Sequence, residues 1–105
     1  MSDADWKLKL RYGRLKTPYS HFTVFADGVV GKLEGGFECR PGPAIMAMRT
    51  WATDTEEAVD MICTIGRQIG FSVTGRIRVY NSEPEVAPGE NPHGYGINFE
   101  PYGDA

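Results

Sequence analysis

Cationic side chains in two alternating segments are the residues best placed to bind another molecule. Lys7, Lys9 and Arg11 alternate with apolar residues near the start of the chain, and Arg76 and Arg78 do so later. If both segments are strands, each set lies on one face of a sheet, because side chains alternate across a strand. Like charges on neighbouring strands repel unless an anion compensates them. The pattern predicts a docking face for an acidic protein, an RNA or a small anionic ligand, although such cations also simply solubilise a sheet and blunt its edges.

Aromatic and imidazole side chains form a second set of candidate binding residues. Tyr80 follows the second cationic segment and, with His21 and Phe25, could stack on a flat ligand. His93 and Tyr95 lie in a segment rich in Gly, Pro and Asn, which suits either a binding loop or a plain hairpin connection. The candidate binding residues are therefore Lys7, Lys9, Arg11, Arg76, Arg78, Tyr80, His93 and Tyr95.

No spacing in the sequence points to catalysis, to a metal or to a cofactor. The cysteines and histidines form no CxxC or HxxxH pair, since they stand at Cys39, Cys63, His21 and His93. The sequence also contains no GxSxG elbow and no phosphate-binding glycine loop. We therefore assign no catalytic residue, no metal and no cofactor, and the sequence favours a protein that is not an enzyme.

Charge is distributed unevenly along the chain. The net charge is −3, but residues 1–52 hold eight Lys or Arg and five Asp or Glu, while residues 53–105 hold three and nine. A negative net charge and the lack of an RNA-recognition signature argue against nucleic acid as a partner, and the charge also argues against an anionic membrane. The acidic second half would suit a basic protein partner.

The start of the chain and its two cysteines predict a cytoplasmic protein. The first six residues lack the basic and apolar regions of a secretory signal, and no apolar run approaches the length of about 18 residues that a transmembrane helix needs. Cys63 falls within an apolar helical stripe, where a reduced, buried thiol is expected. We expect Cys39 to be reduced as well.

Alternation and turn residues predict the strands that position the candidate residues. A tight turn is expected at Asp27-Gly28, a bulge or close approach at Gly75, and a short strand or hairpin tip at residues 32–37. A proline-rich acidic loop is expected at residues 82–94. The main strands are predicted at residues 6–12, 21–26, 44–52, 71–80 and 95–102.

One amphipathic helix is predicted over residues 54–70. Its cap is formed either by Thr53 with Glu56 or by Asp54 with Glu57, and Gly70 is a natural left-handed stop. Its apolar stripe recurs at helical spacing and consists of Ala58, Met61, Ile62, Ile65 and Ile69. We expect the stripe to pack on Leu8, Leu10, Val24, Ile77 and Val79.

These elements predict an α+β fold: a two-layer sandwich in which one long helix covers one face of a mainly antiparallel sheet of 4–6 strands. We expect a single domain over residues 1–105, with residues 1–4 and 103–105 frayed. The other face of the sheet would stay open and carry both cationic segments.

The sequence favours a small soluble binding protein without enzymatic activity. A protein-interaction module or a stoichiometric inhibitor, such as an immunity-type protein that neutralises a toxin, fits the polarised charge and the proline-flanked loops. The alternative is a small-molecule-binding domain or a small enzyme, with its site on the open sheet face or near His93. Self-association into a homodimer is open in either case.

Overall fold

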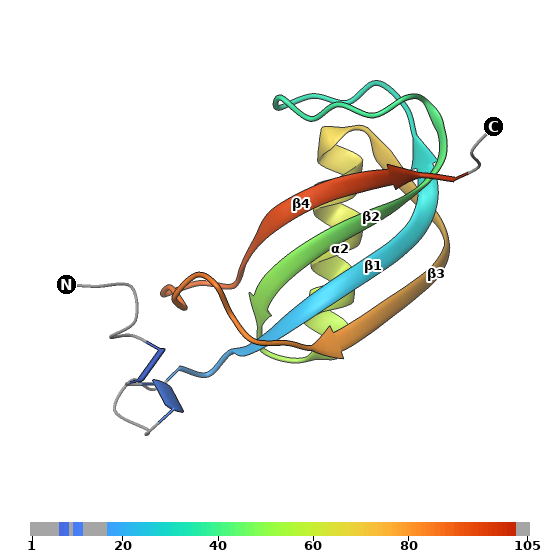
Figure 1. Ribbon diagram of the computed structural model, residues 1–105. Coiled ribbons are helices and arrows are strands. Elements are labelled where there is room, and N and C mark those ends of the chain that lie inside the picture. The colour runs from blue at the N-terminus through green and yellow to red at the C-terminus, as the bar shows by residue number, and fades with distance from the viewer. Residues whose placement is uncertain (1–6, 9, 12–16, 103–105) are drawn as a thin grey trace.

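A computed structural model describes residues 7–8, 10–11 and 17–102. It contains the strands β1 (Ser20–Val30) and β2 (Gly42–Ala52), the helix α2 (Thr55–Ile69), and the strands β3 (Phe71–Asn81) and β4 (His93–Pro101), in that order (Figure 1). The expected fraying of residues 1–4 and 103–105 falls outside the described residues. Within the described residues, no helix is long and apolar enough to cross a membrane.

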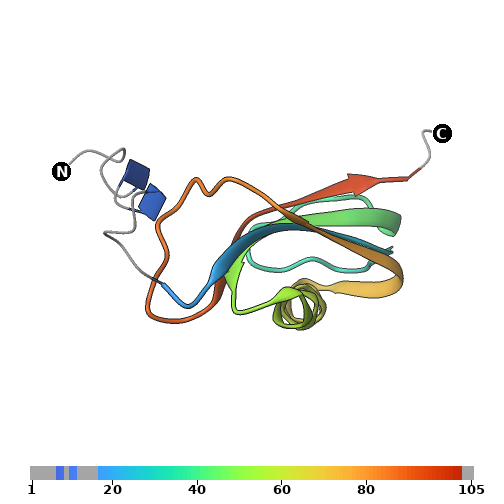
Figure 2. The same ribbon diagram turned by 90° about the horizontal axis from the view of Figure 1, so that it is seen from below.

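The four strands form one antiparallel sheet in the order β3-β1-β2-β4. The segment from β2 through α2 to β3 crosses over β1, so that β3 joins the far side of β1. Figure 2 shows α2 on one side of the sheet only. The predicted α+β two-layer arrangement is confirmed.

The helix begins and ends as its sequence predicts. The Asp54 carboxylate accepts a hydrogen bond from the Glu57 backbone N–H at 2.8 Å, so the second of the two expected caps forms. The Glu57 carboxylate reaches back to the backbone N–H of Thr53 at 2.7 Å. Gly70 closes the helix in the left-handed region at φ 106°, and an added Cβ there would lie 2.2 Å from the Lys32 carbonyl oxygen.

The core lies between α2 and the face of the sheet that it covers. Alternate residues of β1 and β2 are almost fully buried there, among them Val24, Met46 and Met48, and they meet Ile62 of the helix. The expected stripe residues all belong to this cluster, as do Ile77 and Val79 of β3. The helix has its fewest contacts with β4, where Phe37 of the β1–β2 loop packs on Phe99 with ring centroids 6.0 Å apart.

The strand expected over residues 6–12 is wrong for the residues described. Lys7, Leu8, Leu10 and Arg11 are helical, and Leu8, which was expected under the helix stripe, is 49% exposed. Leu, Lys and Arg are strong helix formers, so alternation alone does not hold them extended without a neighbouring strand. The remaining residues of that segment, Lys9 among them, lie outside the described residues.

One expectation within β1 is wrong, and one just after it is resolved. Asp27-Gly28 is no turn, because β1 continues through it to Val30. Gly28 is needed for close approach instead, since an added Cβ would lie 2.1 Å from the Ser72 carbonyl oxygen of β3. Of the two alternatives for residues 32–37 the hairpin tip is the correct one, because these residues form no strand and belong to the loop that joins the antiparallel strands β1 and β2.

Both outer strands carry an irregularity. The pairing of β3 with β1 shifts between Ala26 and Gly28, where Gly75 faces Asp27, and this confirms the bulge expected at Gly75. The pairing of β4 with β2 shifts between Ala47 and Arg49, next to Gly96 at φ 61°. These bulges bend the edges at which further strands would otherwise pair.

Candidate functional site

The face of the sheet opposite α2, called the open face below, is the surface on which the candidate site lies. Strand pairing places its side chains in rows across the sheet. One row runs through Arg78, Phe25, Ala47 and Asn98, and the next holds Asp27, Ile45 and Glu100. In these two rows the middle strands supply the apolar Phe25, Ala47 and Ile45 together with the carboxylate of Asp27, and the outer strands supply polar side chains.

The β3–β4 loop (residues 82–92) covers one end of the open face. Trp51 points to this face, yet it is only 2% exposed, because the loop lies over it. Its indole N–H donates a hydrogen bond to the Val86 carbonyl oxygen of the loop at 2.7 Å. Arg49 forms an ion pair with Glu85 of the loop at 3.6 Å, and Tyr19 donates to the Glu90 carbonyl oxygen at 2.8 Å. In Figure 2 the first part of the loop, directly after β3, lies on the side of the sheet away from the helix, and the rest turns around the end of the sheet toward β4. Only the remaining part of the open face is bare.

His21 ties this loop to the sheet. Its Nε2 lies 2.6 Å from the Tyr95 hydroxyl, and its Nδ1 lies 3.1 Å from the Ser82 carbonyl oxygen and 3.0 Å from the Ser82 hydroxyl. A carbonyl oxygen only accepts, so the Nδ1 carries the proton and the Tyr95 hydroxyl donates to Nε2. The Tyr95 hydroxyl in turn accepts the Glu85 N–H at 3.0 Å. Burial lowers the pKa of His21 below 6.5, although the Ser82 carbonyl opposes that shift.

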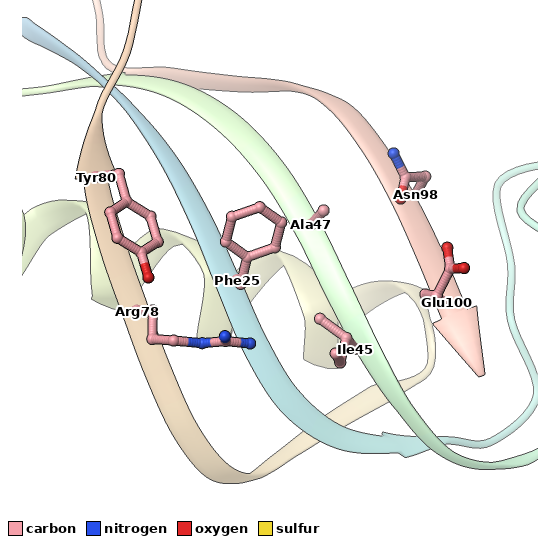
Figure 3. Close-up of a pocket in the computed structure, with 7 residues that line it drawn as sticks. All are labelled: Phe25, Ile45, Ala47, Arg78, Tyr80, Asn98 and Glu100. Atoms are coloured by element: carbon pink, nitrogen blue, oxygen red, sulfur yellow. The ribbon is translucent and has the colours of Figure 1, made fainter. Parts of the chain in front are cut away.

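A concavity of about 370 Å³ lies on the bare part of the open face (Figure 3). Its floor consists of Phe25, Ile45 and Ala47 from the two middle strands. Arg78 and Tyr80 of β3 form one rim, and Asn98 and Glu100 of β4 form the other. The arrangement offers an apolar surface between a cationic edge and an anionic edge, and we call it the open-face concavity.

Arg78 is held in place without a hydrogen bond among the described residues. Its guanidinium carbon lies 5.6 Å from the centre of the Phe25 ring, and an Nη lies 3.8 Å from an Asp27 carboxylate oxygen. The same carboxylate oxygen accepts the Tyr102 hydroxyl at 2.8 Å, which raises the pKa of Tyr102. The Arg78 Nε is buried and has no hydrogen-bond partner. Guanidinium donors of this side chain therefore remain to be satisfied.

The seven candidate residues that the structure describes fall into four places. Lys7 and Arg11 do not share a sheet face with Arg78, since with Leu10 they line a separate hollow beside Glu83 and Pro84 of the β3–β4 loop. Arg78 and Tyr80 meet at the open-face concavity, and Arg76 is exposed beside the bulge of β3. The other two residues lie at the covered end: the Tyr95 hydroxyl bonds to His21, and the His93 carbonyl accepts the Thr50 hydroxyl.

Sequence reasoning missed much of the open-face concavity. Ile45 and Ala47 form its floor, and Asn98 and Glu100 form its second rim. A signal for the floor was present, because these two apolar residues stand on the side of an alternating strand that points away from the helix. No sequence signal identified the second rim, since it depends on which strand pairs with β2.

The described residues contain no group of three His, Cys, Asp or Glu side chains that could hold a metal ion. Comparisons with protein-family models, with curated proteins and with solved structures found no match to this chain.

Proposed function

We propose that this chain is a binding domain that docks a protein partner on the bare part of its open face. The observation that carries the proposal is the open-face concavity, whose apolar floor lies exposed between two polar rims. Tyr80 is 52% exposed on one rim, and Val29 is 41% exposed further along the same face. An apolar patch with a polar rim is the pattern of a protein-interaction surface.

The edges of the sheet are poorer docking sites than its face. β3 and β4 are the outer strands, and each is interrupted by a bulge that breaks the straight row of free backbone groups. A partner strand would therefore find no long, regular ladder to extend. This supports docking through side chains on the open face.

A different protein fits the open face better than a second copy of this chain. If two sheets met face to face about a twofold axis along the strands, both β3–β4 loops would occupy the same space. An axis across the strands would separate the loops, but it would place β4 over β4 and so bring Glu100 near its own copy. Both arrangements are unfavourable.

A small ligand is the second candidate for the open-face concavity. The volume of about 370 Å³ falls within the range of small-molecule pockets. The two rims, however, stand on outer strands separated by three strand spacings, or about 14 Å. A protein surface can cover the floor and contact both rims at once, whereas a small ligand would have to span most of this distance, and this favours the protein partner.

The setting and role that we propose follow from these features. A stoichiometric inhibitor of the immunity type needs a rigid exposed surface of this kind, and a general interaction module needs the same. Cys39 and Cys63 are unpaired thiols, which supports a reducing, cytoplasmic location.

Placing a charge in the floor tests the proposed function. Ala47→Arg fills the floor from the solvent side, and Gln68→Arg adds the same side chain to the exposed side of α2. Captured partners are identified by mass spectrometry, purified and titrated against each variant. We expect Ala47→Arg to weaken binding at least about tenfold and Gln68→Arg to leave it unchanged.

A second measurement locates the contact between the partner and this chain. Hydrogen exchange of the complex should show protection at Phe25 and Ala47. The proposal fails if Ala47→Arg binds like the unmodified chain, or if protection falls on α2 instead. Thermal unfolding of both variants checks that each remains folded.

A further inference from the structure

We infer that Arg78 receives a single carboxylate, from an Asp or Glu side chain of the docked protein. The inference rests on the proposed function and names the chemistry of its central contact. The guanidinium donors of Arg78 have no hydrogen-bond acceptor among the described residues.

Within the described part of the chain, the Arg78 guanidinium lacks a hydrogen-bond acceptor. A guanidinium carries five N–H donors in a fixed fork, and a buried donor without an acceptor is costly. Asp27 lies 3.8 Å from one Nη, which is an ion-pair distance but too long for a hydrogen bond, and Nε has no partner. The side chain as a whole is nevertheless 39% exposed, so an incoming group can reach the guanidinium from its solvent side, while Nε itself is buried.

The Arg78 guanidinium is held in one orientation by its neighbours. The guanidinium lies over the Phe25 ring, and the Tyr80 ring meets that ring edge-on with centroids 6.1 Å apart. Asp27 is itself fixed by the Tyr102 hydroxyl and acts as a positioning residue for Arg78. A pre-oriented guanidinium loses little freedom on binding, and its fork matches a carboxylate in a bidentate contact.

The charges around Arg78 limit how much negative charge a ligand can bring to the open-face concavity. Among the described residues, Arg78 is the only cation that lines the open-face concavity. Glu100 lines the opposite rim, and Asp27 already offsets part of the positive charge. A phosphate group or a nucleic acid backbone would need several cations here. The single negative charge of one carboxylate is enough to balance Arg78 here. A partner protein of any net charge can supply such a carboxylate.

The apolar floor indicates that the carboxylate arrives on a larger apolar surface rather than as a free ion. Phe25, Ile45 and Ala47 gain nothing from a small hydrated anion, but they are covered when a side chain with carbon atoms docks beside Arg78. The source is therefore a protein side chain, and a free anion is the outcome that the experiment must separate from it.

The experiment titrates the full chain, labelled with ¹⁵N, with three small probes and follows the Arg78 Nε–H signal and the amides of Phe25 and Ala47. Phenylacetate carries an apolar ring and a carboxylate, phenylacetamide is its neutral match, and acetate lacks the ring. We expect phenylacetate to shift these signals and to bind at least about fivefold more tightly than either of the other probes.

Variants assign the effect to Arg78. Arg78→Gln should abolish the preference for phenylacetate over phenylacetamide, and Arg78→Lys should keep part of it. Arg67→Gln, on the exposed last turn of α2, should leave it unchanged. If Arg78→Gln fails to fold, raising the salt concentration on the unmodified chain replaces it, because salt should weaken phenylacetate binding and spare phenylacetamide.

Three results would overturn the inference. Equal affinity for phenylacetate and phenylacetamide would mean that the open face binds apolar groups without reading the carboxylate, and the proposed function would survive. Acetate binding as tightly as phenylacetate would define a free-anion site. No shift at Arg78 with any probe would remove the contact, while the Ala47→Arg experiment would still judge docking separately.

Discussion

At the scale of single residues, His21 links the start of the β3–β4 loop to β4. Its ring joins Ser82, at the start of the β3–β4 loop, to Tyr95 of β4, and its edge packs against Trp51 with ring centroids 5.1 Å apart. All of these contacts suit a neutral ring protonated at Nδ1. A second proton on Nε2 would remove the acceptor to which the Tyr95 hydroxyl donates.

The stability of the protein should therefore fall in acid. Burial lowers the pKa of His21 in the folded state, so the unfolded chain binds its proton first as the pH drops below about 6.5. The free energy of unfolding is then highest above this value and decreases until the folded-state pKa is reached. Arg49 and His93 lower this pKa further, while Glu85 raises it.

The measurement is chemical denaturation at a series of pH values between about 7.5 and 5. We expect His21→Gln to flatten the pH dependence that the unmodified chain shows in this window, and His93→Gln to retain it. The same slope in His21→Gln and in the unmodified chain would assign the acid sensitivity to other groups.

At the scale of secondary-structure elements, α2 depends on its first turn. Asp54 caps the N-terminus, and Glu57 returns to the Thr53 backbone N–H, so two free donors are satisfied together. Glu56 and Glu57 also lie near the positive end of the helix dipole.

Removing the cap should cost measurable stability. We expect Asp54→Ala to lower the free energy of unfolding by about 1 kcal/mol, because it leaves the Glu57 N–H without its acceptor. Asp60→Ala, at an exposed position further along the helix, should have a much smaller effect. Urea denaturation at pH 7 compares the two, and an equal loss in both variants would contradict a specific capping role.

Elements with a strong local signal were the ones that the sequence could predict. The helix was identified from its caps and its 3.6-residue stripe, and β3 from alternation plus the glycine at its bulge. The segment around Lys7 failed because a short alternating run cannot distinguish an isolated helical turn from a strand that lacks a neighbour. Asp27-Gly28 failed because a close approach and a turn both call for glycine.

At the scale of the whole molecule, the strand order decides where the site forms. Arg78 and Glu100 face each other across the floor only because β3 joins β1 and β4 joins β2. Pairings of this kind connect residues far apart in the sequence, and no local pattern encodes them. The fold class was therefore predictable, while the open-face concavity required the three-dimensional arrangement.

The geometry of the open face predicts a monomer in the absence of the partner. The β3–β4 loops obstruct one face-to-face dimer, and like charges oppose the other. Light scattering coupled to size-exclusion chromatography should give a mass near 11.6 kDa for the full chain up to high micromolar concentration. A mass of twice this value that Ala47→Arg halves would show that the open face binds a second copy instead.

Several roles meet in the single strand β4. Asn98 and Glu100 supply one rim of the open-face concavity, Tyr95 holds His21, and the carbonyl of His93 accepts the Thr50 hydroxyl. A premature stop codon shortly before residue 93 would spare α2 and the β1–β2 hairpin. It would nevertheless bare the outer side of β2, release the anchor of the preceding loop and delete one rim of the open-face concavity in a single event.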